Sequence, residues 1–212
     1  MRAHVALLGD SIFDNAAYTR GRPDVIGHLR SILPADSTAT LLAVDGSTTS
    51  EVRDAQVPQL PTDVTHAVVS MGGNDALMDS DALDLPVSST KEALSLFGDR
   101  ANVFESRYRG TVEAITKRVP FVAVCTVYDP RLPGVEGSTT RVGLAIFNDV
   151  ISRVAFANRI PLIDLRQLVV EPADFANELE PSSEGARKIA TAIYQVVRAA
   201  PAEVGSLVVG KA

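Results

Sequence analysis

Residues 3–11 read AHVALLGDS, a mainly apolar run that passes directly into Gly9, Asp10 and Ser11. A short apolar run closed by turn residues is typical of a buried strand in a parallel sheet. The same pattern recurs at 40–44 (TLLAV), 67–71 (AVVSM), 121–127 (FVAVCTV) and 161–165 (PLIDL). We therefore predict five buried parallel strands, each followed by a loop.

Helical periodicity separates these runs. Apolar residues recur three or four positions apart in the segments 24–33, 50–60, 90–118 and 140–157, and again after Pro181-Ser182-Ser183. Strands that alternate with helices predict a parallel sheet covered by helices on both faces. The length of 212 residues fits a single domain spanning residues 1–212.

The composition excludes several classes of protein. A net charge of −6, from 20 basic and 26 acidic residues, argues against binding to nucleic acid or to anionic lipid. The single cysteine, Cys125, excludes an intrachain disulfide, and the three scattered histidines form no metal-ligand spacing. We find neither a run long enough for a membrane span nor a cleavable secretory signal, and therefore expect a cytoplasmic location.

Polar residues and glycines gather where the predicted strands end, which is where parallel sheets bind ligands. Ser11 follows the first strand and either presents a nucleophilic hydroxyl or merely caps a turn. Gly46 either offers a backbone N–H to an anion or is a loop glycine, and Asn74 is either an amide donor or a turn residue. Together the three form the layout of an acyl-transfer site, with a nucleophile and an oxyanion hole.

The chain here resembles the SGNH or GDSL-type hydrolases over nearly its whole length. The resemblance is carried by Leu8-Gly9-Asp10-Ser11, Gly46, Gly72-Gly73-Asn74-Asp75 and the terminal Pro181-Ser182-x-x-Gly185. It implies a flavodoxin-like three-layer α/β/α fold and esterase, lipase or acylhydrolase chemistry on a small-molecule ester, with no cofactor. It also implies Ser11 as nucleophile, and an oxyanion hole from the N–H groups of Ser11 and Gly46 and the side chain of Asn74.

The last motif departs from that family pattern. The family has Asp-x-x-His-Pro-Ser, whereas this chain reads Asn177-Glu178-Leu179-Glu180-Pro181-Ser182. Glu180 thus stands in the position of the base and Asn177 in that of its aspartate partner. A neutral asparagine avoids repelling the glutamate, and we expect its amide to donate to the Glu180 carboxylate. Ordinary pKa values make glutamate a weaker base than histidine by about two units, or roughly 3 kcal/mol.

The three histidines are not expected to replace the missing base. His4 and His66 precede their strands and therefore lie at the opposite edge of the sheet. His28 falls inside the first predicted helix, which leads away from the strand ends.

Three hypotheses for Glu180 remain open. It is the unorthodox base of a serine hydrolase, or the mark of a hydrolase fold that binds an acylated or anionic ligand without turnover. In the third, Glu180 is structural, paired with Arg131 or Arg187, and another group transfers the proton.

Other residues complete the prediction. We place Asp10, Asp75, Tyr128 and Arg131 among the substrate contacts, and expect the loops 76–89 and 129–139 to frame an acyl pocket. A solvated acidic loop explains Asp75, Asp79, Asp81 and Asp84 better than a calcium site, and no phosphate-binding glycine motif is present. The sequence leaves the oligomeric state open.

Overall fold

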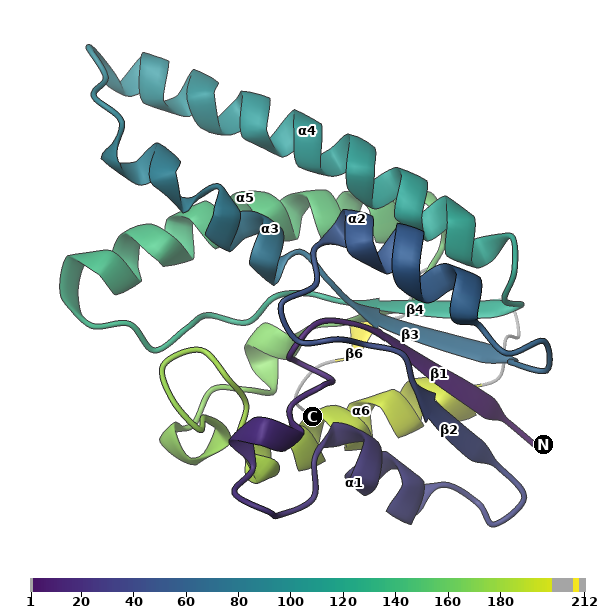
Figure 1. The fold of residues 1–212 in the computed structure, drawn as a ribbon. Helices are drawn as coiled ribbons and strands as arrows, with labels where there is room; N and C mark the ends of the chain where they lie inside the picture. The colour runs from purple at the N-terminus through teal and green to yellow at the C-terminus, as the bar shows by residue number, and fades with distance from the viewer. Residues whose placement is uncertain (1, 200–207, 210–212) are drawn as a thin grey trace.

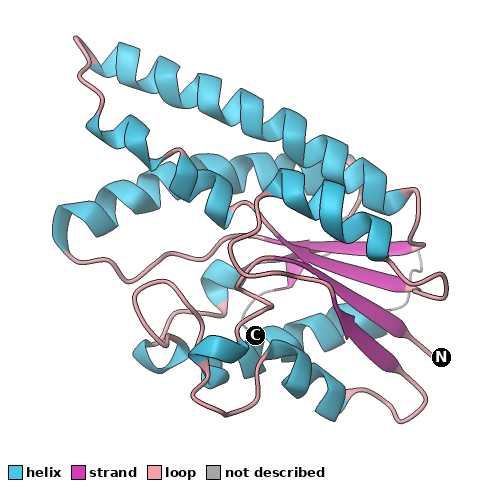
Figure 2. Ribbon diagram, viewed as in Figure 1, coloured by secondary structure: helices cyan, strands magenta, loops and turns pink. Residues whose placement is uncertain are grey.

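The computed structural model describes residues 2–199 and 208–209, which form a parallel sheet between two layers of helices (Figures 1 and 2). The strand order is β2-β1-β3-β4-β5-β6, and every neighbouring pair is parallel. The strands are β1 (His4–Gly9), β2 (Thr38–Leu41), β3 (His66–Ser70), β4 (Phe121–Cys125), β5 (Leu162–Ile163) and β6 (Val208–Val209). The five predicted parallel strands are confirmed, and the two-residue β6 extends the sheet beyond β5.

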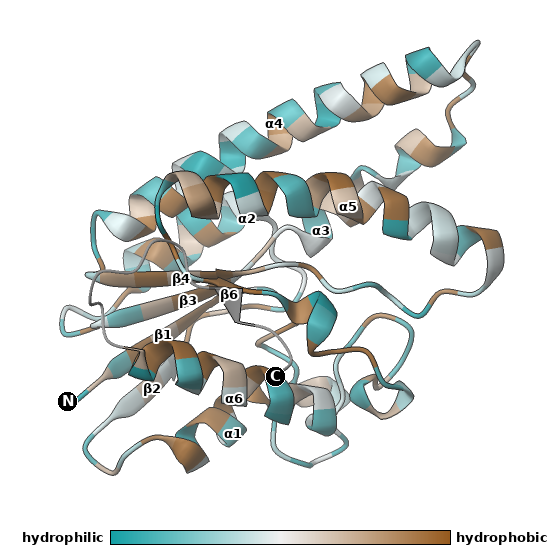
Figure 3. Ribbon diagram, turned by 180° about the vertical axis from the view of Figure 1, so that it is seen from behind, coloured by the Kyte–Doolittle hydropathy of each residue, from teal (hydrophilic) through white to brown (hydrophobic). Residues whose placement is uncertain are grey.

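Alternation along the strands builds one apolar core on each face of the sheet. Val5 and Leu7 of β1 belong to the core that includes α1 (Val25–Ile32) and α6 (Ser183–Arg198). Their neighbours Ala6 and Leu8 belong to the opposite core, with α4 (Thr90–Thr116) and α5 (Gly134–Ala157). Successive strand side chains point to opposite faces, so one strand serves both cores. Figure 3 shows the sheet from behind, with the helices of the two layers carrying both hydrophobic (brown) and hydrophilic (teal) residues.

In two segments the observed secondary structure differs from the predicted one. The segment 50–60 is three short helical pieces: α2 (Thr49–Glu51), a π-helix η2 (Val52–Gln56) and a 3₁₀-helix η3 (Val57–Gln59). The loop 76–89 is partly helical, with α3 (Gly73–Met78) and η4 (Ser80–Asp84). The remaining 3₁₀-helices are η1 (Ala16–Tyr18), η5 (Leu165–Gln167) and η6 (Pro172–Asp174).

Helix α5 begins six residues earlier than the predicted start at residue 140. Pro133 is its N-cap residue, a place outside the helix where no backbone N–H is required. Gly137 lies inside the first turns, and a side chain there would start only 2.0 Å from the carbonyl oxygen of Leu132. These residues predicted a loop, but Pro133 precedes the first turn of a helix and Gly137 allows that helix to pass close to the backbone of Leu132.

Gly9 ends β1 with a backbone conformation and a contact that other residues do not tolerate. Its φ is +134°, and a Cβ would lie 1.8 Å from the carbonyl oxygen of Ser70 on the neighbouring strand. Gln56 holds the two peptide groups on either side of the Gly9 Cα: its Oε1 accepts the Gly9 N–H at 2.8 Å, and its Nε2 donates to the Gly9 carbonyl at 2.7 Å. This tight exit directs Asp10 and Ser11 to the carboxyl edge of the sheet.

We predict that Gly9→Ala lowers the free energy of unfolding by about 3 kcal/mol, because it adds a clash to an unfavourable backbone conformation. Gly21→Ala is the matched control: Gly21 also has positive φ, but its Cβ would meet no atom within 4 Å. It should cost only about 1 kcal/mol. Urea unfolding of the two variants measures the difference, and equal losses would contradict the role assigned to the Ser70 contact.

Candidate active site

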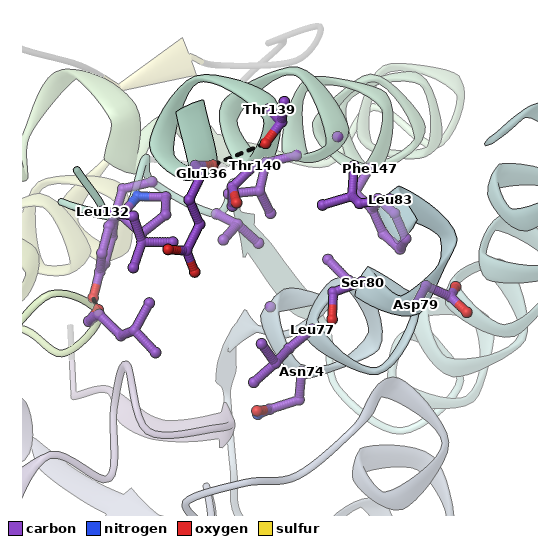
Figure 4. Close-up of a pocket in the computed structure, with 18 of the residues that line it drawn as sticks. Asn74, Leu77, Asp79, Ser80, Leu83, Leu132, Glu136, Thr139, Thr140 and Phe147 are labelled. Carbon is purple, nitrogen blue, oxygen red and sulfur yellow. Dashed lines mark hydrogen bonds between the residues drawn. The ribbon is translucent and has the colours of Figure 1, made fainter. Parts of the chain in front are cut away.

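A cavity of about 610 Å³ opens at the carboxyl edge of the sheet, where β1, β3 and β4 end (Figure 4). Its wall includes Ser11, Asn74 and Glu180, together with Asp10 and Tyr128. The rest comes largely from α3, η4, the first half of α5 and the segment that leads into α5. Three motifs far apart in the sequence thus meet at one cavity.

Ser11 and Glu180 are directly joined. The Ser11 hydroxyl donates to Glu180 Oε1 at 3.2 Å, across 169 positions of the chain. Ser11 is buried, and Glu180 lies in the loop just before α6. The Glu180 carboxylate is therefore within hydrogen-bond distance of the Ser11 hydroxyl, as a proton acceptor must be.

Asn177 has a different role from the predicted one. Its Oδ1 accepts the backbone N–H groups of Leu179 and Glu180, both at 2.8 Å. Among the described residues, no hydrogen bond joins its amide nitrogen to the Glu180 carboxylate. The expected side-chain pair is therefore wrong: asparagine closes a tight local turn, as its short polar side chain often does, and so shapes the backbone that carries Glu180.

Tyr128 and Arg131 anchor the same loop. The Tyr128 hydroxyl donates to the carbonyl of Leu179 at 2.6 Å, and the Arg131 N–H donates to the carbonyl of Glu178 at 2.7 Å. The Arg131 guanidinium stacks over the ring of Phe175, 5.7 Å from its centroid. Tyr128 lines the cavity, whereas Arg131 is not part of its wall, and the contact of Arg131 with substrate stays a prediction.

The surroundings of Glu180 favour its neutral form. Burial raises the pKa of its carboxyl, the nearby charge of Asp45 raises it further, and the hydrogen bond from Ser11 opposes both. Oε2 is buried without a hydrogen-bond partner among the described residues. These effects bring the carboxyl closer to the proton affinity that a base needs near neutral pH.

The structural hypothesis for Glu180 required an arginine partner. Arg187 instead pairs with Glu184 at 3.2 Å, and Arg131 stacks on Phe175. No salt bridge between described residues includes Glu180. The predicted ion pair is therefore absent from this part of the chain.

Asp10 is a second buried carboxyl in the cavity wall. Burial raises its pKa to about 7, repulsion from Glu180 contributes in the same direction, and the backbone N–H of Ile12 opposes the rise. That N–H donates to Asp10 Oδ1 at 3.1 Å. Asp10 thus stabilises the turn that carries Ser11, and its raised pKa brings its change of charge close to neutral pH.

The three candidate oxyanion donors differ in whether they already form a hydrogen bond within the protein. The Asn74 side chain lines the cavity and donates to the carbonyl of Ser47 at 3.0 Å, which uses one of its two N–H bonds. Gly46 has a φ of +82° in the loop after β2. Within the described ranges, neither the Ser11 N–H nor the Gly46 N–H has a hydrogen-bond partner, which leaves both available to a ligand.

Asp75 is a structural residue in this fold. It is buried, and its Oδ2 accepts both the N–H and the hydroxyl of Thr49, each at 2.8 Å. The carboxylate faces the start of α2 and is not part of the cavity wall, and its contact with substrate stays a prediction. Asp75 ties the motif after β3 to the loop that carries Gly46.

Several contributors to the site have no clear signal in the sequence. Asp45 accepts the Tyr18 hydroxyl at 2.7 Å and acts on Glu180 through its charge. Phe97, Arg100 and Gly143 line the cavity from helices α4 and α5. For Asp45, the only sequence signal is its position next to Gly46. For the three helical residues there is none, because a helical pattern does not show which turn of the helix borders a cavity.

The remaining predictions concern metals and histidines. Arg100 binds Asp79 at 2.7 Å and Asp81 at 3.6 Å. No group of three metal-ligating side chains occurs among the described residues. His4 contacts Asp63 and Thr40, His28 contacts Ser183, and His66 contacts Thr65, so each histidine has a partner other than Ser11. None of the described helices is long and apolar enough to span a membrane.

Comparison with known proteins defines the family. Residues 7–188 match the model of the GDSL-like Lipase/Acylhydrolase family, and the chain therefore belongs to this family. No curated protein matches the sequence. Among solved structures, the lipase Lip_vut3 from a goat rumen metagenome has a TM-score of 0.70 at 18% identity, covering 92% of this chain and 97% of its own.

Two further structures share the fold. An extracellular lipase from Streptomyces rimosus has a TM-score of 0.63 at 16% identity, with 92% of this chain and 100% of that chain covered. An acetylxylan esterase from Geobacillus stearothermophilus has a TM-score of 0.64 at 17% identity, with 92% and 94% covered. At these identities, the likeness shows a common fold.

We predict that Asp10 makes the protein less stable as the pH rises. Its ordinary pKa is 3.8, so between about pH 4 and pH 7 the folded protein holds a proton that the unfolded chain has lost. The free energy of unfolding should fall over this range by up to about 4 kcal/mol. Asp10→Asn keeps an acceptor for Ile12 and should flatten the slope.

Urea unfolding at a series of pH values measures this dependence. Asp99→Asn serves as the control and should keep the wild-type slope, because Asp99 is exposed on α4 and has no salt bridge or side-chain hydrogen bond among the described residues. A slope in Asp10→Asn as steep as that of the wild type would show that another group causes it.

Proposed function

We propose that this protein is a serine-dependent ester hydrolase in which Ser11 is the nucleophile and Glu180 the proton acceptor. The observation that carries the proposal is the 3.2 Å hydrogen bond from the Ser11 hydroxyl to Glu180 at the wall of the cavity. Membership of an acylhydrolase family and the esterase and lipase neighbours support the same class of reaction. The substrate is a small-molecule ester.

In the proposed reaction, Ser11 Oγ attacks the ester carbonyl carbon while its proton passes to Glu180. The tetrahedral intermediate collapses, the carbon–oxygen bond to the alcohol breaks, and protonated Glu180 returns the proton to the leaving alkoxide. A water molecule then attacks the acyl-serine, with Glu180 again accepting a proton. The acid is released, and Ser11 and Glu180 regain their starting forms.

The oxyanion of each intermediate would be held by the Ser11 N–H, the Gly46 N–H and the Asn74 amide. Both backbone groups are free of other partners within the described chain, and Asn74 retains a second N–H bond. Donors fixed before the reaction stabilise the developing charge without having to reorganise. The bond from Asn74 to Ser47 fixes the orientation of the amide.

A glutamate base sets limits on the substrate. Its ordinary pKa lies about two units below that of histidine, and burial restores part of the difference. We therefore expect esters with good leaving groups, such as aryl esters, to be cleaved faster than alkyl esters. Structures of the acetylxylan esterase neighbour include a catalytic mutant of a serine and one of a histidine. The proposed base, a glutamate, is therefore where this chain would differ from that esterase.

Substitutions test the two central roles. Ser11→Ala should lower kcat for a short-chain aryl ester about a thousandfold or more. Glu180→Gln keeps the size and a hydrogen-bonding oxygen but accepts no proton, and should lower kcat on the order of a hundredfold or more. Glu178→Gln is the matched control, because this exposed carboxylate on the same loop lies outside the cavity wall.

The same assay separates the proposal from a role in ligand binding alone. Equal background rates in the wild type, Ser11→Ala and Glu180→Gln would reject catalysis by either residue. If only Glu180→His then gained turnover, the protein would be a hydrolase fold that has lost its base.

The pH dependence of activity gives an independent test. Because Glu180 acts as its ionised form, kcat/KM should rise with pH through the raised pKa of Glu180 and then level off. Asp45→Asn removes a neighbouring negative charge and keeps an oxygen for Tyr18, so the midpoint should move to lower pH. Asp63→Asn, beside His4 at the opposite edge of the sheet, should leave it in place. An upward shift in Asp45→Asn would contradict this assignment.

A further inference from the structure

The cavity extends well beyond Ser11, along the first half of α5. Phe147 lies near the sheet, because the next residue, Asn148, exchanges two hydrogen bonds of 2.8 Å with the backbone of Val127. Glu136 lines the same cavity eleven residues earlier, which corresponds to about 16 Å along the helix axis. Figure 4 shows both residues facing the space across from Leu77 and Ser80.

Apolar side chains form much of this extension. They come from α3, η4, α4, α5 and the segment before α5, and they include Leu77, Leu83, Phe97, Leu132, Leu144 and Phe147. Leu77 is 57% exposed and Leu83 is 42% exposed, so large apolar surfaces face solvent at the cavity. Such surfaces lower the free energy when an apolar ligand covers them.

The volume is much larger than an acetyl group requires. A water molecule takes up about 30 Å³ of liquid, so 610 Å³ corresponds to roughly twenty waters. The reacting ester carbonyl has to lie beside Ser11 and Asn74, and the acyl chain then has an apolar path between α3 and α5. Each methylene buried along it is expected to raise affinity about fourfold.

We infer that this cavity binds a medium-chain acyl group, such as octanoyl or decanoyl, and that Gly143 determines how long a chain it accepts. The inference rests on the proposed function for the placement of the ester carbonyl. Gly143 lies within α5 and lines the cavity, and a Cβ added there would meet no atom within 4 Å. Glycine is disfavoured in the interior of a helix, and here it leaves the acyl path open.

Gly98 supplies a matched control. It also lies within a long helix, α4, and a Cβ there would likewise meet nothing within 4 Å. It is exposed and is not part of the cavity wall. The same substitution at the two glycines therefore has a similar effect on helix propensity and fills the cavity only at residue 143.

The first experiment compares kcat/KM for p-nitrophenyl octanoate and p-nitrophenyl acetate. The wild type should prefer octanoate. Gly143→Leu should lower the octanoate-to-acetate ratio at least tenfold, Gly143→Ala should lower it less, and Gly98→Leu should leave it unchanged. Thermal unfolding of each variant checks the fold, and the graded pair at Gly143 keeps the test valid if the leucine variant folds poorly.

The second experiment measures binding without turnover. Calorimetry of octanamide, a neutral probe with an acyl chain, should show binding to Ser11→Ala, and adding Gly143→Leu to that variant should weaken binding at least tenfold. Serine-dependent hydrolysis with a preference for acetate and no octanamide binding would overturn the acyl site while the proposed function stands. Octanamide binding that is sensitive to residue 143, without ester turnover in the wild type, would support the acyl site and reject the proposed function. An unchanged ratio and unchanged binding in the Gly143 variants would overturn the role of Gly143.

Discussion

The backbone of Gly9 lies so close to the carbonyl of Ser70 that a side chain cannot be accommodated, and this contact fixes where β1 ends. Gln56 holds the two peptide groups on either side of the Gly9 Cα, through the Gly9 N–H and the Gly9 carbonyl. The next two residues, Asp10 and Ser11, are therefore carried to the carboxyl edge of a rigid parallel sheet. Without that placement, the Ser11 hydroxyl would not face an acid supplied by the far end of the chain.

The electrostatics of the site depend on burial more than on ion pairing. Asp10 and Glu180 line the cavity with Ser11, Asp45 acts on Glu180 through its charge, and none of the three carboxyls forms a salt bridge among the described residues. Desolvation raises the pKa values of Asp10 and Glu180, and so does the charge of a neighbouring carboxylate, which is Glu180 for Asp10 and Asp45 for Glu180. A carboxylate with a raised pKa is a better proton acceptor than it is in water. Burial of this kind offsets part of the difference in proton affinity between a glutamate and a histidine.

The sequence predicted the strands because each is a short apolar run closed by turn residues. It predicted the helices because their apolar residues recur three or four positions apart. It was less informative where a segment departs from a regular helix, as in the π-helix of Val52–Gln56, or where Pro133 precedes a helix instead of a loop. Among the site residues, Ser11, Asn74 and Glu180 meet at the cavity as expected from their motifs. Asp75, Asn177 and Arg131 make contacts that their motifs did not predict, since a short-range motif does not show which direction a side chain faces.

Short apolar runs, the turn residues that close them and the helical periodicity between them were sufficient, by themselves, to determine a parallel sheet with its polar rim at one edge. The motifs also determined which residue types stand on that rim, including a glutamate where the family has histidine. Tertiary structure alone decided that Asn177 closes a turn, that Asp75 faces Thr49 and that a long apolar cavity lies between α3 and α5. Those features depend on how elements distant in sequence pack together, and such packing leaves no periodic trace along the chain.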